Sequence, residues 1–175
     1  MAAGNTYVAI ATQTLGSAAS SVTFSSIPAI YTDLILVTQY MSSANGGLFL
    51  QYNGDSGNNY SIVNLISSAN TNPSTYTTAD QPYVWADTYL QGTGTVTTDR
   101  PMTISHIMNY ANTTTFKTTL LRSGDVRTTS STDGTSYMGA ALWRNTSAIN
   151  SITVLCGGGN FIVTSTFSLY GIASA

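Results

Sequence analysis

The chain carries very little charge. Its 175 residues include seven Asp, four Arg, one Lys and no Glu, which gives a net charge of −2 and a charged fraction of only 7%. A protein that binds nucleic acid neutralises a row of phosphate groups with Lys and Arg, so five basic residues exclude that class of partner. Surface helices are usually rich in Glu and Lys, and the same scarcity therefore argues against helical structure.

Cysteine and long apolar runs are scarce as well. Cys156 is the single cysteine, which excludes an internal disulfide framework. No apolar run approaches the roughly 20 residues of a membrane-spanning helix. Residues 1–5 have neither the basic region nor the apolar segment of a signal peptide. We therefore expect a protein that is made in a cytoplasm and has no membrane partner.

Hydroxyl-bearing and β-branched residues stand where charges are missing. The chain has 29 Thr, 22 Ser and 11 Tyr together with abundant Val, Ile and Leu, and this composition favours strands. Residues 101–110 alternate with a period of two, which places Met102, Ile104, His106 and Met108 on one face. Because that face is the more apolar one, we expect it to be the buried side of the strand.

Other segments show related patterns. Residues 116–120 place Leu120 on the face opposite Lys117, and residues 137–144 place Tyr137 and Trp143 together on one face. A third segment, residues 33–41, is apolar on both faces, which predicts a central strand that is covered on both sides.

Turn signals give the outline of the fold. A Gly-rich stretch, residues 157–160, separates two strand-like runs at 149–156 and 161–172, which is typical of a β-hairpin. Similar clusters divide the chain into about ten strands, spaced as in an antiparallel β-sandwich or a barrel. We expect an all-β protein in which residues 1–5 form a short arm and residues 6–175 form a single β-sandwich domain.

Nine short stretches in a fixed order carry a family resemblance. They are ATQTL at 11–15, SVTFSSIP at 21–28, YTDL at 31–34, YNGDSG at 52–57, NYS at 59–61, LWR at 142–144, INSIT at 149–153, GNF at 159–161 and TFSLYGI at 166–172. Taken together they resemble small virion structural proteins of tailed bacteriophages. The resemblance implies a non-enzymatic protein with a two-sheet antiparallel β-sandwich of the jelly-roll kind. Residues 68–98 fit least, so we expect the protein's own specificity to lie there.

Within that family the resemblance suggests a capsid decoration protein, also called a cement protein. Such a protein binds the outside of the assembled capsid and stabilises it. The expected partners are therefore the major capsid protein and further copies of this chain, as a homotrimer. The expected location is the capsid exterior of the virion, after synthesis in the host cytoplasm.

The residues that could support catalysis do not form a recognisable set. His106 is the one histidine, and it shares its strand face with aliphatic residues, which is typical of a hydrogen-bonded packing residue. No Gly-x-Ser-x-Gly motif is present, and most Asp residues fall at turns or strand ends, where Asp stabilises local backbone. Cys156 shares a face with Ile152 and Val154, so we expect it to be buried. We predict no enzyme activity and no cofactor.

Residues 53–59 combine several oxygen-bearing side chains with two glycines. This composition is typical of a hairpin turn that is stabilised by Asn and Asp side chains. A weak calcium site is the alternative, although the stretch lacks the bidentate acidic ligand that closes an EF-hand loop. We favour the turn and predict no metal.

An aromatic stripe is the candidate contact site. Tyr83, Trp85, Asp87 and Tyr89 occupy alternate positions of one predicted strand and would share one face. Aromatic rings with an inserted carboxylate can stack on sugars or bind a protein partner. The structural alternative is that the rings cover one sheet, with Asp87 at its rim. A sugar platform would indicate a second function, a tail-associated or receptor-binding module that recognises carbohydrate on the host surface.

Overall fold

The computed structural model describes residues 6–44, 46–68, 71–90, 100–126 and 134–173. These residues form twelve strands and no helix, and hence no helix that could cross a membrane. The strands are β1 (Tyr7–Thr14), β2 (Ser21–Phe24), β3 (Asp33–Gln39), β4 (Gly46–Tyr52), β5 (Tyr60–Ser68), β6 (Thr71–Gln81), β7 (Val84–Leu90), β8 (Met102–Ile107), β9 (Lys117–Val126), β10 (Gly134–Trp143), β11 (Ile152–Cys156) and β12 (Thr166–Ile172). The predicted arm, residues 1–5, lies outside the described part of the chain.

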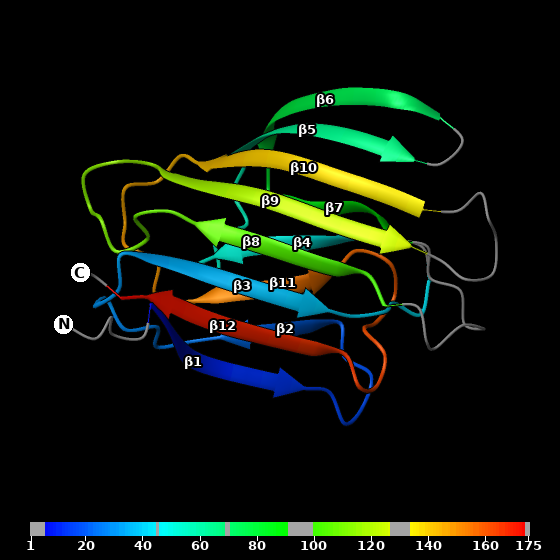
Figure 1. Ribbon diagram of the computed structural model, residues 1–175. Helices are drawn as coiled ribbons and strands as arrows, with labels where there is room; N and C mark the ends of the chain where they lie inside the picture. Colours follow the sequence, from blue (N-terminus) through cyan, green and yellow to red (C-terminus); the bar gives the residue numbers. More distant parts are fainter. Residues whose placement is uncertain (1–5, 45, 69–70, 91–99, 127–133, 174–175) are drawn as a thin grey trace.

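The strands form two antiparallel sheets that pack face to face (Figure 1). The larger sheet has the strand order β1-β12-β3-β8-β9-β10-β5-β6, and the smaller sheet has the order β2-β11-β4-β7. In Figure 1 the larger sheet lies in front, with β6 at its upper edge and β1 at its lower edge. The predicted two-sheet antiparallel β-sandwich is confirmed.

Side chains between the two sheets form one hydrophobic core. The larger sheet contributes Leu36 and Leu169, and the smaller sheet contributes Leu48 and Val154, all fully buried. Burial of each such side chain contributes roughly 1.5 to 3 kcal/mol relative to exposure. The alternation of apolar and polar positions along the strands thus supplies the apolar surface that holds the sheets together.

The predicted alternation is confirmed in β10, where Tyr137 and Trp143 are both buried. In β3 the prediction is only half right, because Leu34 is buried whereas Ile35 and Val37 are half-buried. β3 is a central strand of the larger sheet. One of its faces meets the smaller sheet, but no second layer of described residues covers the other face.

β8 buries the face opposite to the predicted one. Thr103, Ser105 and Ile107 are fully buried, whereas Met102 is 48% exposed, and His106 lies on the same outward side as Met102. The hydroxyl face can lie inside because Thr103 Oγ1 donates a hydrogen bond to its β9 neighbour, the Ser123 hydroxyl, at 3.1 Å. A buried hydroxyl that has a partner avoids most of the cost of leaving water.

β9 has the same inverted arrangement. Leu120 and Lys117 lie on opposite faces, as predicted, but Lys117 is fully buried and Leu120 is 45% exposed. Lys117 Nζ donates to the carbonyl oxygens of Thr115 at 2.7 Å and Thr146 at 3.1 Å. Burial lowers the pKa of Lys117, because the ammonium ion loses hydration inside the protein.

Residues 157–160 do not form the predicted hairpin. β11 belongs to the smaller sheet and β12 to the larger one, so their connection crosses from one sheet to the other. Phe161 follows this connection and is fully buried. Its ring packs edge to face against Tyr40 and Phe167, at centroid distances of 5.4 and 4.9 Å. Burial of this ring between the sheets outweighs the local preference of the glycines for a hairpin turn.

Candidate binding surfaces

The outward side of the larger sheet is apolar over five adjacent strands, and we call this surface the outer face. Its apolar side chains are Val63 and Leu65 of β5, Met138, Ala140 and Leu142 of β10, Leu120 of β9, Met102 and Ile104 of β8, and Ile35 and Val37 of β3. The five most exposed range from 45% for Leu120 to 56% for Met138. Adjacent strands lie about 4.8 Å apart, so the surface is about 20 Å wide.

The register between strands joins these side chains into continuous rows. The rows are Leu65–Met138, Val63–Ala140–Leu120 and Ile104–Val37. Side chains directly opposite each other on one face have Cβ atoms about 4.5 to 5.5 Å apart, so members of a row are in contact. The apolar side chains of the outer face are therefore grouped in rows, which Arg122 and His106 of the neighbouring strands interrupt.

Charge on the described part of the outer face comes from few groups. Arg122 is exposed and lies in register with Met138 on one side and Ile104 on the other. His106 Nε2 and Asp33 Oδ2 are 2.8 Å apart, and the other oxygen of Asp33 accepts the backbone N–H of Asn109 at 2.7 Å. The carboxylate is thus held by two local contacts at one margin of the patch.

Exposed apolar area of this kind makes the outer face a candidate binding surface. Monomeric soluble proteins rarely expose such patches above a few hundred Å² unless the patch contacts a partner or a membrane. Completing the burial of a half-exposed Leu, Met or Val contributes roughly 1 kcal/mol, so the five most exposed side chains offer about 5 kcal/mol. The outer face is suited to a large, uncharged protein surface.

The predicted aromatic stripe is only partly on one face. Tyr83 and Trp85 are half-buried, and Trp85 packs partly against the core, but Asp87 is only 3% exposed and points between the sheets. A register shift in the pairing of β7 with β4, between Leu48 and Phe49, reverses the alternation before Asp87. The side chain of Tyr89 lies outside the described residues. The prediction that Asp87 shares the aromatic face or its rim is therefore wrong.

The rings of Tyr83 and Trp85 stack on further aromatic residues. Tyr83 stacks on Phe49 of β4 at 4.2 Å, and Trp85 stacks on Tyr76 of β6 at 5.5 Å with nearly parallel planes. Tyr76 is 44% exposed. These contacts occupy ring faces that a sugar platform would leave free, and they fasten the edge strand β6 onto the smaller sheet.

Asp87 is part of a buried polar network between the sheets. Its Oδ2 accepts a hydrogen bond of 2.5 Å from Ser123 Oγ, which in turn accepts one from Thr103. Tyr40 is fully buried, and loss of hydration together with the negative charge of Asp87 raises its pKa well above the usual value. Sequence reasoning missed this network, although the run of Ser and Thr at alternate positions of β8 and β9 was a signal for it.

The described residues contain no group of three or more His, Cys, Asp or Glu that could hold a metal ion. Cys156 is half-buried against the core and donates a weak hydrogen bond to the carbonyl oxygen of Gly158 at 3.4 Å. Burial raises the pKa of this thiol, and the hydrogen bond opposes the shift only in part. A thiol of raised pKa is a weak nucleophile, so packing is its role here, although its burial is less complete than predicted.

Residues 53–59 form the predicted side-chain-stabilised turn, but they join two sheets instead of closing a hairpin. One oxygen of Asp55 accepts the backbone N–H of Gly57 at 2.9 Å, and the other accepts Nε1 of Trp143 at 2.7 Å and Nδ2 of Asn59 at 3.0 Å. Partial burial would raise the pKa of Asp55, but these hydrogen bonds outweigh it and hold the pKa below its usual value. The oxygens that a calcium ion would need are thus engaged within the protein.

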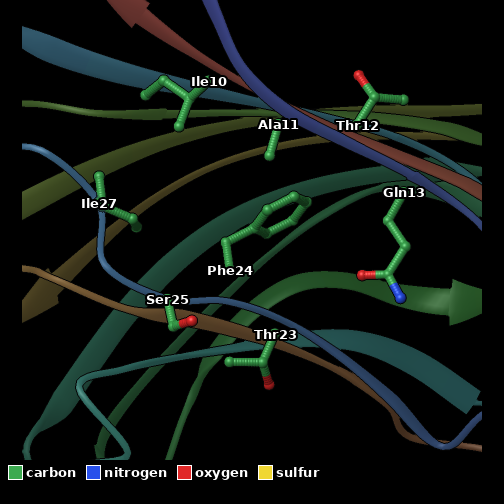
Figure 2. Close-up of a pocket in the computed structure, with 8 residues that line it drawn as sticks. All are labelled: Ile10, Ala11, Thr12, Gln13, Thr23, Phe24, Ser25 and Ile27. Atoms are coloured by element: carbon green, nitrogen blue, oxygen red, sulfur yellow. The ribbon is translucent and has the colours of Figure 1, made fainter.

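A groove of about 300 Å³ separates β1 from β2 along one side of the sandwich (Figure 2). Ile10, Phe24 and Ile27 line its apolar part, and Figure 2 shows the ring of Phe24 directed toward β1. Thr12 and Gln13 add polar groups from β1. The groove lies between the edges of two different sheets, and nothing in the sequence pattern indicated it.

Comparison of this chain with protein-family models, curated proteins and solved structures found no match.

Proposed function

We propose that this chain is a non-enzymatic structural protein of a phage particle, of the capsid decoration type, which binds the assembled shell through its outer face. The observation that carries the proposal is the largely apolar surface, with few charged groups, that extends over five strands of the larger sheet. The ordered resemblance to small phage virion proteins, which spans nearly the whole chain, supports the same conclusion.

The strand order supports a jelly-roll as the framework for this role. Strands β1, β12, β3 and β8 are neighbours in the larger sheet, and β2, β11, β4 and β7 form the smaller one. An eight-stranded double sheet with this order is what two interlocked Greek keys produce. The pairs β5–β6 and β9–β10 then extend one sheet of the jelly-roll, and most of the outer face lies on that extension.

Binding to an assembled shell stabilises it by mass action. A protein that binds the shell and not its free subunits shifts the equilibrium toward the shell, by about 2.7 kcal/mol per site when its concentration is a hundred times the dissociation constant. No turnover is needed. Repetition of the same weak contact over the particle adds avidity.

The test uses particles that lack this protein and the purified full chain. The wild-type protein should co-sediment with such particles and raise the temperature at which they break. Leu120→Asp places a charged carboxylate in the centre of the outer face and should weaken binding at least tenfold, because burial of that charge is costly. Thr153→Asp, on β11 of the smaller sheet, is the matched control and should bind as the wild type does. Equal binding by both variants would remove the outer face from the proposal, and particles as robust without the protein as with it would refute the decoration role.

The receptor-binding alternative stays a prediction. It requires Tyr83 and Trp85 to contact carbohydrate, so Tyr83→Ala and Trp85→Ala particles should fail to adsorb to cells while remaining stable. Decoration proteins occur in hundreds of copies per particle and tail tips in a few, so a stained gel of purified virions also separates the two functions.

A further inference from the structure

β1 is an edge strand with an open side. Among the described strands it pairs with β12 alone, and none of its eight side chains is buried. The backbone N–H of Leu15 donates a hydrogen bond to the carbonyl oxygen of Ser165, beside β12, at 2.9 Å. Because backbone groups alternate in direction along an antiparallel strand, the N–H and C=O groups of Thr12 and Thr14 face away from β12. They form a row of donors and acceptors along the open edge.

This edge has few of the features that usually prevent strands from pairing between molecules. Natural edge strands are protected by proline, charge, bulges or short length. The opposite edge of the sheet, β6, contains Pro73 and Asp80, and its pairing with β5 shifts register twice. By contrast, β1 contains no proline and no charge, and its pairing with β12 shifts register once, between Ala9 and Ala11. The first charged residue of the whole chain is Asp33.

The groove beside β1 offers a place for the side chains of an added strand. A strand that paired with β1 would lie over the gap between β1 and β2, and every second side chain would point into the groove. Its apolar lining, Ile10, Phe24 and Ile27, would then become covered. The open edge and the groove therefore favour the same occupant, an extended uncharged segment with apolar side chains on one side.

We infer that this occupant is the β1 strand of a second copy of the chain, paired antiparallel about a two-fold axis. β1 fits the site: it is extended and uncharged, it presents Ile10 and Ala11 together with Gln13 to the groove, and its own edge is open. An antiparallel pair of identical strands is self-complementary, so each copy supplies donors where the other has acceptors. Eight residues give roughly eight hydrogen bonds, which is close to the number in a standard interface.

The two-fold axis of such a pair is perpendicular to the sheet. The two larger sheets join into one continuous sheet of sixteen strands, and both outer faces lie on the same side of it. This dimer differs from the homotrimer that the family resemblance implies. It rests on β1 and the groove, and so it does not depend on the proposed capsid contact.

The test is the oligomeric state of the full chain, measured by sedimentation equilibrium at up to about 1 mM, the range that detects weak association. The wild type should be a dimer. Thr12→Pro removes an outward N–H without removing a hydrogen bond to β12, so it should weaken association at least tenfold. Thr12→Ala loses the same side-chain hydrogen bond to Ser168 but keeps the N–H, and it should remain a dimer. Circular dichroism checks that both variants are folded.

Hydrogen exchange of the unmodified protein gives an answer that does not depend on any variant. In the dimer the amides of Thr12 and Thr14 should exchange at least tenfold more slowly than after dilution to monomer. A wild-type monomer over the whole concentration range, a trimer, or a dimer in which these two amides exchange at the monomer rate would each overturn the inference.

Discussion

In β8 and β9 several polar side chains face the core and apolar side chains face outward, which is the reverse of the usual arrangement. Toward the smaller sheet these strands present Thr103, Ser105, Lys117 and Thr119, all fully buried. Toward the outside they present apolar side chains such as Leu120, which is 45% exposed. Thr103, Lys117 and Thr119 have hydrogen-bond partners on the buried side, whereas the hydroxyl of Ser105 has none among the described residues. The exposed side has apolar area that no described residue covers. The contrast shows that specific polar contacts hold part of the interior here, while the outer surface keeps exposed apolar area.

The largest effect should come from alkaline pH, which acts on the inner side alone. Loss of hydration raises the pKa of Tyr40, Tyr52, Tyr60 and Tyr137 in the folded protein. Above about pH 10 the unfolded chain releases tyrosine protons that the folded chain keeps, so stability falls by up to about 1.4 kcal/mol per pH unit for each tyrosine. Burial lowers the pKa of Lys117 in the folded protein, so this residue makes stability rise with pH, but only below the pKa that it has in the unfolded chain. Urea unfolding between pH 8 and 11 should show a steep loss, and a flat profile would contradict the burial of these hydroxyls.

The next largest effect should come from removing a buried cation, and removing an exposed cation on the other side of the sheet provides the comparison. Lys117→Ala removes a buried side chain and leaves the carbonyl oxygens of Thr115 and Thr146 without their donor, so it should cost about 3 kcal/mol of unfolding free energy. Arg122→Ala removes an exposed cation from the outer face and should change stability by less than about 0.5 kcal/mol. Chemical denaturation measures both. Equal costs would mean that the two sides do not differ as described.

A smaller effect comes from exchanging a hydroxyl for a methyl group of the same size. Tyr52 Oη and Thr119 Oγ1 are 2.6 Å apart in the core, so Thr119→Val leaves the phenol unpaired and should cost about 1 to 2 kcal/mol. That corresponds to a fall in Tm of about 2 to 8 °C for a chain of this size. Thr118→Val, one position away on the outward side, is the control and should leave Tm nearly unchanged.

The smallest effect on stability should follow from making the outer face polar. Leu120→Ser changes a side chain that is already half exposed, so the isolated protein should lose less than about 1 kcal/mol. Calorimetry of the purified variant gives the value. A loss above about 2 kcal/mol would show that Leu120 is part of the core and not of a surface awaiting a partner.

That the chain forms antiparallel strands could be predicted from the sequence, because alternation marks a strand regardless of which side faces inward. The partner of each strand could not be predicted, since the hairpin expected between β11 and β12 is absent. Which side of β8 faces inward could not be predicted. Met102 and Ile104 were expected inside because apolar side chains usually gain from burial, but Thr103 and Ser105 occupy that place. Thr and Ser are ambiguous in this respect, since a hydroxyl with a partner is tolerated in a core.

Local irregularities account for the other errors. The register shift before Asp87 has no residue signature, so strict alternation placed this carboxylate on the wrong face of β7. Glycines 157–159 favour a tight turn, but Phe161 packs against Phe167 and against Tyr40, and Tyr40 is distant in sequence. The rings of Tyr83 and Trp85 both lie near the ring of Phe49, at centroid distances of 4.2 and 6.3 Å.

The position of β12 between β1 and β3 has a consequence for the order of folding during synthesis. Tyr7 pairs with Ile172, so the first strand has no neighbour in its sheet until the last strand has left the ribosome. At typical elongation rates that interval is roughly 10 to 30 s. During it, β1 and one side of β3 are unpaired edges in a chain with almost no charge to keep nascent copies apart. Pairing of β12 with β1 and β3 therefore completes the larger sheet. Before β12 has been synthesised, the chain is most exposed to aggregation or to binding by a chaperone.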